Sequence, residues 1–241
     1  MPRKKEALEL IRMVGRRDEM KALLVALKSR QCRLIVGPAG IGKTRLIEEC
    51  IAGSRQRVVR VEQPPVLHHL LVQLAEQLGC RSARYSSAAR ATSIHLKPLV
   101  LNALRAGPAV VIVENLENRD PRMYRFLQEL YYIPGPCLVV TARSMDRIGH
   151  VRKLLWDPGE KIVMKPLSRP ESIALFEEAA HIFRLESFDV EDFRNKVLEA
   201  AHGNPGKIIA MCRLATQPEY RSGRYIKFLP LRMDMLSAFV S

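Results

Sequence analysis

The segment between residues 37 and 44 has the composition best suited to chemistry. It reads Gly37-Pro38-Ala39-Gly40-Ile41-Gly42-Lys43-Thr44 and matches the pattern G-x-x-x-x-G-K-[ST]. In this pattern the small residues let backbone N–H groups surround phosphate oxygens, while the lysine reaches the β and γ groups and the threonine hydroxyl helps hold Mg²⁺. The segment therefore predicts a nucleoside triphosphate site, and a chance glycine turn is the weaker alternative.

A phosphate site of this kind also needs a carboxylate that holds the metal ion and its water shell. Glu114 ends the apolar run 110–113, so it is the candidate for this role together with Thr44. Asn115 follows it and cannot accept a proton from an attacking water. Activation of water must then be slow or come from another group, for which Glu117 is the candidate. Slow hydrolysis and no hydrolysis without a partner both stay open.

Five short apolar runs are expected to form the sheet that positions these residues. They lie at residues 32–36, 57–62, 109–113, 137–141 and, more weakly, 161–164. Apolar residues with helical spacing lie between them, near 20–27, 46–51, 66–78, 93–105 and 121–131. Alternating strands and helices predict an α/β fold with a mostly parallel five-stranded sheet sandwiched by helices, and ligands at the carboxyl ends of its strands.

From residue 166 onward the sequence predicts helices only. Ser168 and Glu171 form a capping box before the first of three amphipathic segments. We therefore expect a nucleotide-binding core at residues 1–165, including a basic leader, and a small all-helical subdomain at 166–215. The tail at 216–241 shows no clear periodicity, so no structure is predicted for it.

The charge of the chain is distributed unevenly. Residues 1–105 contain 20 basic and 8 acidic residues, whereas residues 106–241 contain 19 and 17. This asymmetry suggests that the first half meets a polyanion, either nucleic acid or an acidic membrane surface. The five cysteines are odd in number and widely spaced, which favours reduced thiols in a core. Since no apolar run is long enough to cross a bilayer, we expect a soluble cytoplasmic protein.

Together these motifs resemble those of P-loop ATPases of the AAA+ and STAND group, near the origin-recognition and archaeal-type ATPase branch. The resemblance covers residue 14 to about residue 214 and rests on three further motifs. Val14-Gly15-Arg16-Arg17-Asp18-Glu19 is similar to the V-G-R-x-x-E box that helps cradle adenine, Thr141-Ala142-Arg143 is similar to sensor 1, and His202-Gly203-Asn204-Pro205 is similar to the G-x-P turn of the lid.

The resemblance implies a role for each matching residue. The residues that would act in catalysis are Lys43, Glu114, Glu117, Thr141 and Arg143. Those that would bind ATP are Val14, Gly15, Arg16, the run from Gly37 to Thr44, Arg45 and Pro205. For Arg143 the alternative is a solvated loop charge, and for Pro205 a plain helix-initiating turn. No arginine aligns securely with the sensor 2 position of the lid, where Lys207 is a weak substitute.

Further arginines have two interpretations each. Arg147 and Arg152 follow the sensor 1 segment, where the family often carries an arginine finger that acts on a neighbouring subunit; surface charges are an equal alternative. A second group, half of it around Tyr85, lies in the region that commonly faces the pore of DNA-encircling relatives, which suggests contact with DNA phosphates. A solvated face or a contact with protein is the alternative. The members of this group are Arg55, Arg57, Arg60, Arg81, Arg84 and Arg90.

Two functions are consistent with this sequence. The first is an ATP- and Mg²⁺-dependent AAA+ switch or motor that forms homo-oligomers through its ATP site, acts on DNA and uses a separate effector protein. The second is a STAND-like signalling switch that binds protein partners and no nucleic acid. ATP is favoured over GTP because an N-K-x-D motif is missing.

Overall fold

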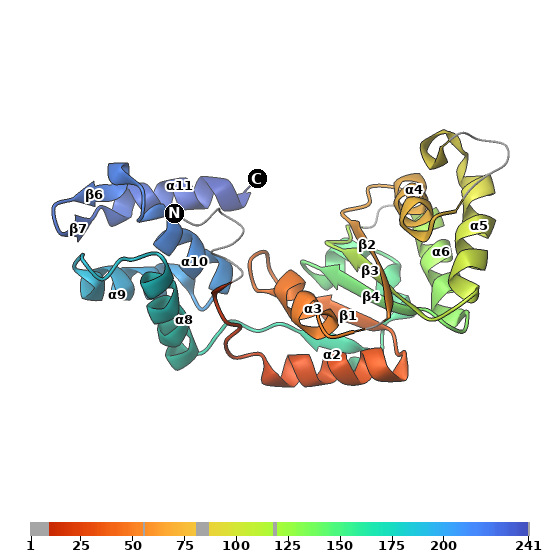
Figure 1. Ribbon diagram of the computed structural model, residues 1–241, viewed down its shortest axis with the longest axis horizontal. Coiled ribbons are helices and arrows are strands. Elements are labelled where there is room, and N and C mark those ends of the chain that lie inside the picture. Colours follow the sequence, from red (N-terminus) through yellow and green to blue (C-terminus); the bar gives the residue numbers. More distant parts are fainter. Residues whose placement is uncertain (1–9, 55, 81–86, 118–119, 241) are drawn as a thin grey trace. The chain divides into compact units, whose positions relative to one another are not determined.

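The computed structural model describes residues 10–54, 56–80, 87–117 and 120–240, which divide into two compact units. The sheet unit consists of residues 18–38 and 43–164, and the helical unit consists of residues 10–17, 39–42 and 165–240 (Figure 1). The sequence places residues 10–17 and 39–42 in the core domain, whereas the structure groups them with the helical unit. The glycine-rich segment is therefore divided: its tip, residues 39–42, is grouped with the helices that follow residue 165, and its two ends are grouped with the sheet.

The strands of the sheet unit form one parallel sheet in the order β2-β3-β4-β1-β5. The strands are β1 Arg33–Val36, β2 Arg57–Glu62, β3 Ala109–Glu114, β4 Cys137–Ala142 and β5 Lys161–Val163. Every residue of β3 and β4 is buried, as expected for parallel strands that are covered on both faces. The predicted five-stranded parallel sheet is confirmed.

Helices cover both faces of this sheet, with α2 and α3 on one side and α4, α5 and α6 on the other (Figure 1). Their bounds are α2 Arg17–Ser29, α3 Lys43–Ile51, α4 Leu67–Leu78, α5 Ser93–Arg105 and α6 Pro121–Tyr132; a short helix, α7 Val151–Leu154, follows β4. Val111 and Val113 of β3 join the apolar core that contains α4, α5 and α6. Since side chains alternate along a strand, Glu114 faces the side of α3.

The edge strand β2 is held by a side chain of α4 in place of a further strand. Gln77 accepts a hydrogen bond from the backbone N–H of Arg60 at 2.8 Å and donates one to the Arg60 carbonyl at 2.6 Å. One amide thus satisfies two backbone groups that the sheet leaves unpaired at its edge. The backbone of Arg60 is therefore fixed, and its side chain points to the same face of the sheet as Glu114.

The helical unit contains the three helices predicted after residue 166. They are α8 Arg169–Ile182, α9 Val190–Ala201 and α10 Pro205–Leu214. The capping box that begins α8 is present in both halves, since Ser168 accepts from the Glu171 backbone and Glu171 accepts from the Ser168 backbone. Phe176 of α8 and Phe193 of α9 pack in the core with ring centroids 5.9 Å apart.

The tail, for which the sequence predicts no structure, folds onto the helical unit. It forms β6 Arg221–Ser222 and β7 Tyr225–Ile226, which pair antiparallel, and then α11 Phe228–Val240. Leu231 and Met235 of α11 are buried, while Leu229 and Met233 are exposed. The helix is therefore apolar on opposite sides and lacks the one-sided periodicity by which amphipathic helices are recognised. The hairpin also means that the unit is not purely helical.

Other expectations concern single groups. All five cysteines are free, and four of them are buried, in agreement with the interpretation of core thiols. Within the described residues no helix is both long and apolar enough to span a bilayer. The same residues contain no cluster of three or more His, Cys, Asp or Glu that could hold a metal ion without other ligands.

Candidate nucleotide-binding site

The glycine-rich segment joins the end of β1 to the start of α3, as predicted. Gly40 has a φ of +76° and Gly42 a φ of +103°, which side chains with a Cβ rarely adopt. Glycine is therefore required at these two positions for the chain to wrap into a loop. The loop leads directly into the N-terminus of α3, where backbone N–H groups without helical partners favour an anion.

Lys43, the first residue of α3, has its ammonium group inside this loop. Its Nζ donates hydrogen bonds to the carbonyls of Gly37 at 2.6 Å and Pro38 at 3.0 Å, and only 6% of the residue is exposed. Burial lowers the pKa of Lys43 to about 8, aided by the charge of Arg143 and opposed by that of Glu114. An anion in the loop would compensate this buried positive charge.

Thr44 and Glu114 meet directly beside Lys43, although they come from different elements. The Thr44 hydroxyl donates a 2.5 Å hydrogen bond to Oε2 of Glu114, which lies at the end of β3 and is 2% exposed. Mg²⁺ is commonly held by one or two protein oxygens together with nucleotide phosphates and water. A hydroxyl and a carboxylate next to a phosphate loop fit that requirement, so these two residues are the ones that would hold the ion.

Arg60 forms an ion pair with the other oxygen of this carboxylate, Oε1 of Glu114. Its guanidinium also lies 3.3 Å from Glu48 and 3.7 Å from Glu62. Burial alone would lower the pKa of Arg60, but Glu114 and Glu48 outweigh it and the pKa is raised. The sequence suggests Arg60 as part of a DNA-binding group, whereas in the structure its guanidinium is paired with the buried carboxylate of Glu114.

Thr141 is fully buried at the end of β4, beside the end of β3. Its hydroxyl accepts a 2.8 Å hydrogen bond from the backbone N–H of Asn115, whose φ of +49° lies in the left-handed region. Thr141 thus shapes the turn that follows Glu114 and can still donate its own hydroxyl proton. Arg143 is exposed just beyond it, near enough to Lys43 to affect its pKa.

The candidate base and a candidate arginine finger contact each other. Arg147 donates a 2.6 Å hydrogen bond to Glu117, and both side chains are exposed. Arg152 is exposed on α7. Arg45, predicted to bind nucleotide, forms an ion pair with Glu49 along α3 at 2.7 Å.

The tip of the loop is held by residues of the helical unit through three successive carbonyls. Asn204 donates from Nδ2 to Ala39 O at 2.9 Å, and the Gly206 N–H donates to Gly40 O at 2.9 Å. The buried guanidinium of Arg16 donates to Ile41 O at 3.3 Å. We call these three hydrogen bonds the loop-tip contacts.

The loop-tip contacts link the glycine-rich loop to two motifs, Val14–Glu19 and His202–Pro205. The sequence suggests both motifs only as parts of the ATP site. Asn204 also caps α10 by accepting from the Lys207 backbone, and Pro205 occupies the first turn of that helix and is half-buried. Val14 packs on the helical core, and Gly15 has a φ of +67° with its Cα close to the Glu171 carboxylate. Asn204 could have been singled out from its place in the H-G-N-P motif, whereas no sequence pattern points to Gly206.

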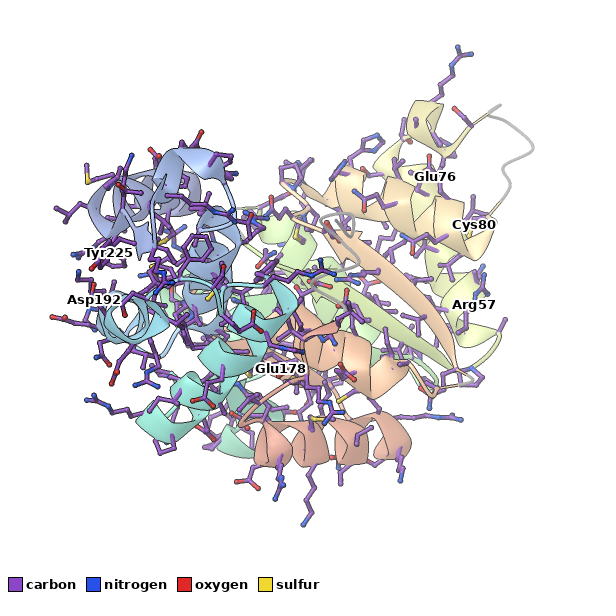
Figure 2. All side chains as sticks on the ribbon, turned by 60° about the vertical axis from the view of Figure 1, so that its left-hand side comes forward. Arg57, Glu76, Cys80, Glu178, Asp192 and Tyr225 are labelled. Carbon is purple, nitrogen blue, oxygen red and sulfur yellow. The ribbon has the colours of Figure 1, made fainter. Side chains whose placement is uncertain are left out.

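The group of arginines expected near Tyr85 is only partly described. Arg55, Arg81, Arg84 and Tyr85 lie outside the described residues, while Arg90 is exposed at the end of a short 3₁₀ turn. Arg57 is exposed, and its guanidinium donates to Leu78 O at 2.7 Å. Figure 2 labels it beside Cys80, the residue that follows α4 and its capping glycine.

Comparisons with known proteins show a family likeness and a shared fold. The model of the AAA domain family matches residues 26–144, just under half of the chain. No curated protein matches the sequence.

Solved structures share the fold at low sequence identity. A Walker-type ATPase of Pyrococcus abyssi is 13% identical with a TM-score of 0.63, covering 94% of this chain and 72% of that one. The Orc1 protein of Aeropyrum pernix, solved in complex with DNA, is 16% identical with a TM-score of 0.70, covering 98% and 69%. A STAND protein with a tetratricopeptide repeat sensor from Pyrococcus horikoshii is 17% identical with a TM-score of 0.54, covering 94% and 32%. Residues 26–144 are therefore similar to the AAA domain family, and the chain has the α/β fold of AAA+ P-loop proteins that its motifs predict.

Proposed function

We propose that this chain binds ATP and Mg²⁺ and works as a nucleotide-dependent switch or motor that oligomerises on DNA, with slow or partner-dependent hydrolysis. The observation that carries the proposal is the ammonium of Lys43, which lies buried inside the glycine-rich loop with a pKa lowered mainly by that burial. A triphosphate supplies the negative charge that compensates it.

The residues of the site would divide the nucleotide between them. Lys43 would contact the β and γ phosphates, and Thr44 with Glu114 would hold Mg²⁺, which stabilises the charge that develops on the phosphates. Thr141 and Arg143 would detect the γ-phosphate from the end of β4. The residues proposed to hold the base and sugar side are Val14, Gly15, Arg16 and Pro205.

Assembly would complete the site from a second copy of the chain. Arg147 and Arg152 are exposed, and either can serve as an arginine finger toward a neighbour's γ-phosphate. Arg147 is paired with Glu117 in this structure, so such a role requires that it exchange Glu117 for the phosphate. This exchange would at the same time release Glu117, the candidate base.

Action on DNA is proposed from charge and from likeness. The first 105 residues carry most of the net positive charge of +14, and Arg90 is exposed. Among the proteins with this fold, Orc1 of Aeropyrum pernix was solved with DNA bound. Contacts between arginines and phosphates are independent of base sequence and weaken steeply as salt rises.

Light scattering tests this proposal directly. We expect the mass of the particle to increase when a nonhydrolysable ATP analogue replaces ADP, and to increase further with duplex DNA at low salt, because nucleotide and DNA both bind the assembled form. The affinity for DNA should fall steeply between roughly 50 and 200 mM salt, as it does when several basic side chains contact phosphates. DNA binding that does not change with salt would contradict the assignment.

A STAND-like switch that binds only protein partners is the second candidate. It is favoured by the ion pair of Arg60 with the buried Glu114, which removes one charge from the surface expected to meet DNA. Growth of the particle with a protein partner and ATP analogue, and none with DNA, would select this function over the first.

Turnover should respond to residue 115. We expect Asn115→Asp to raise the hydrolysis rate several-fold, because it adds a carboxylate after Glu114 and tolerates the left-handed φ of +49° as asparagine does. Asn115→Glu should raise the rate too, at a stability cost of about 1 kcal/mol for that backbone conformation. Phosphate release measures the rate, and Asn115→Gln is the uncharged control. Equal rates in all variants would favour Glu117 or a residue from a neighbour.

A further inference from the structure

The metal-binding carboxylate already has a positively charged partner in the protein. Both oxygens of Glu114 are engaged: Oε2 accepts from the Thr44 hydroxyl, and Oε1 pairs with Arg60. Glu114 is 2% exposed, and a buried carboxylate without a partner is strongly unfavourable. Arg60 therefore neutralises Glu114 in the nucleotide-free protein, at the oxygen next to the one that contacts Thr44.

When Arg60 leaves Glu114, its guanidinium still has two acidic side chains nearby with which to pair. Glu48 of α3 and Glu62 at the end of β2 lie 3.3 and 3.7 Å from the guanidinium, and their side chains are 48% and 71% exposed. A small rotation of the side chain can exchange Glu114 for these two acids. The backbone of Arg60 need not move, because Gln77 holds both its N–H and its carbonyl.

We propose that Arg60 is a resident counter-ion of Glu114, which must yield this carboxylate to Glu48 and Glu62 before the site takes up a divalent cation. The inference rests on the proposed binding of nucleotide with Mg²⁺. It has two consequences: Arg60 supports binding of nucleotide without metal, because it masks the charge of Glu114 beside the phosphates, and it weakens binding of the metal, because the two cations compete for one carboxylate.

The test is the ratio of nucleotide affinity in Mg²⁺ to nucleotide affinity in EDTA, measured with a fluorescent ADP analogue. We expect Arg60→Gln to raise this ratio by about tenfold or more, because Glu114 then repels metal-free nucleotide and attracts Mg²⁺ without competition. Arg57→Gln is the matched control, since it removes the same charge from the same strand at a residue bound to Leu78 instead. An unchanged ratio in Arg60→Gln would overturn the proposal.

A second variant tests the exchange in the opposite direction and keeps Arg60 in place. In Glu48→Gln/Glu62→Gln, Arg60 loses its alternative partners and holds Glu114 more firmly, so we expect the ratio to fall several-fold. Both positions are exposed, which makes folding tolerant of the change. Glu49→Gln removes an exposed acid from α3 outside this cluster and should leave the ratio near the wild-type value. A ratio that stays constant or rises in the double variant contradicts the exchange.

The wild-type protein separates this inference from the proposed function. If the wild type binds neither ADP nor ATP analogues in calorimetry, the proposed function fails and Arg60 has no site to regulate. If the wild type binds nucleotide through Lys43 but Arg60→Gln keeps the wild-type ratio, the function stands and the role of Arg60 fails alone.

Discussion

Replacing Lys43 with methionine should abolish nucleotide binding and at the same time stabilise the nucleotide-free protein. Binding should fall by more than 100-fold, because the ammonium that meets the phosphates is lost. Stability should rise because the charged form of Lys43 is unfavourable in the fold: its pKa of about 8 lies well below the ordinary value of 10.5. A difference of that size corresponds to about 3 kcal/mol. Part of this is offset by the lost hydrogen bonds to two carbonyls.

The pH dependence of this effect has a defined sign. Between pH 8 and 10.5 the unfolded chain binds a proton at Lys43 that the folded chain has released, so the stability of the wild type rises with pH in this window. Below pH 8 the penalty is complete, and above 10.5 it is absent. The difference in melting temperature between Lys43→Met and the wild type should therefore be a few degrees at pH 7 and shrink as the pH rises from 8 to 10.

The same pKa predicts that nucleotide binding takes up protons. Phosphate charge beside the ammonium raises the pKa of Lys43, so near pH 8 a fraction of a proton should be absorbed for each nucleotide bound. Calorimetry in two buffers with different ionisation enthalpies measures this number. No uptake in the wild type, or a melting temperature for Lys43→Met below that of the wild type at pH 7, would contradict the description of Lys43 as an uncompensated buried charge.

The parts of this site that follow from local pattern could be predicted from the sequence. Continuous apolar runs predict buried parallel strands because both faces of such strands are covered. The glycine-rich segment and Glu114 are found for the same reason, since each directly follows a run of that kind. Thr44 and Glu114 then meet because the carboxyl ends of parallel strands lie at one edge of the sheet.

Contacts between side chains of distant elements could not be predicted in this way. Arg60 occupies a position of β2 that looks like any polar residue on an edge strand, and only the register of β2 with β3 brings it near Glu114. Asn204 meets Ala39 across 165 positions of sequence. Such contacts depend on packing between elements, which leaves no period in the sequence. The helix α11 was missed for the opposite reason, because its apolar residues lie on more than one face.

Replacing Gly206 with alanine should weaken nucleotide binding at least tenfold although the substitution favours the helix locally. Gly206 is the second residue of α10, where alanine is better than glycine by about 0.5–1 kcal/mol. A Cβ at this position, however, would lie 2.7 Å from Gly40 Cα and 2.8 Å from Gly40 O. These are backbone atoms of the loop tip, so the loop must shift and the Gly206 N–H loses its hydrogen bond to Gly40.

The matched control is Gly107→Ala, since a Cβ at Gly107 meets nothing within 4 Å and its backbone needs no positive φ. It should leave nucleotide affinity unchanged. Asn204→Asp tests the neighbouring loop-tip contact without removing the cap, because aspartate caps a helix as well as asparagine does. It loses the donor to Ala39 O and places a negative charge against a carbonyl, so affinity should fall while α10 is retained. If Gly206→Ala and Asn204→Asp both bind nucleotide as Gly107→Ala does, the helical unit does not shape the loop, and Lys43, Thr44 and Glu114 suffice for binding.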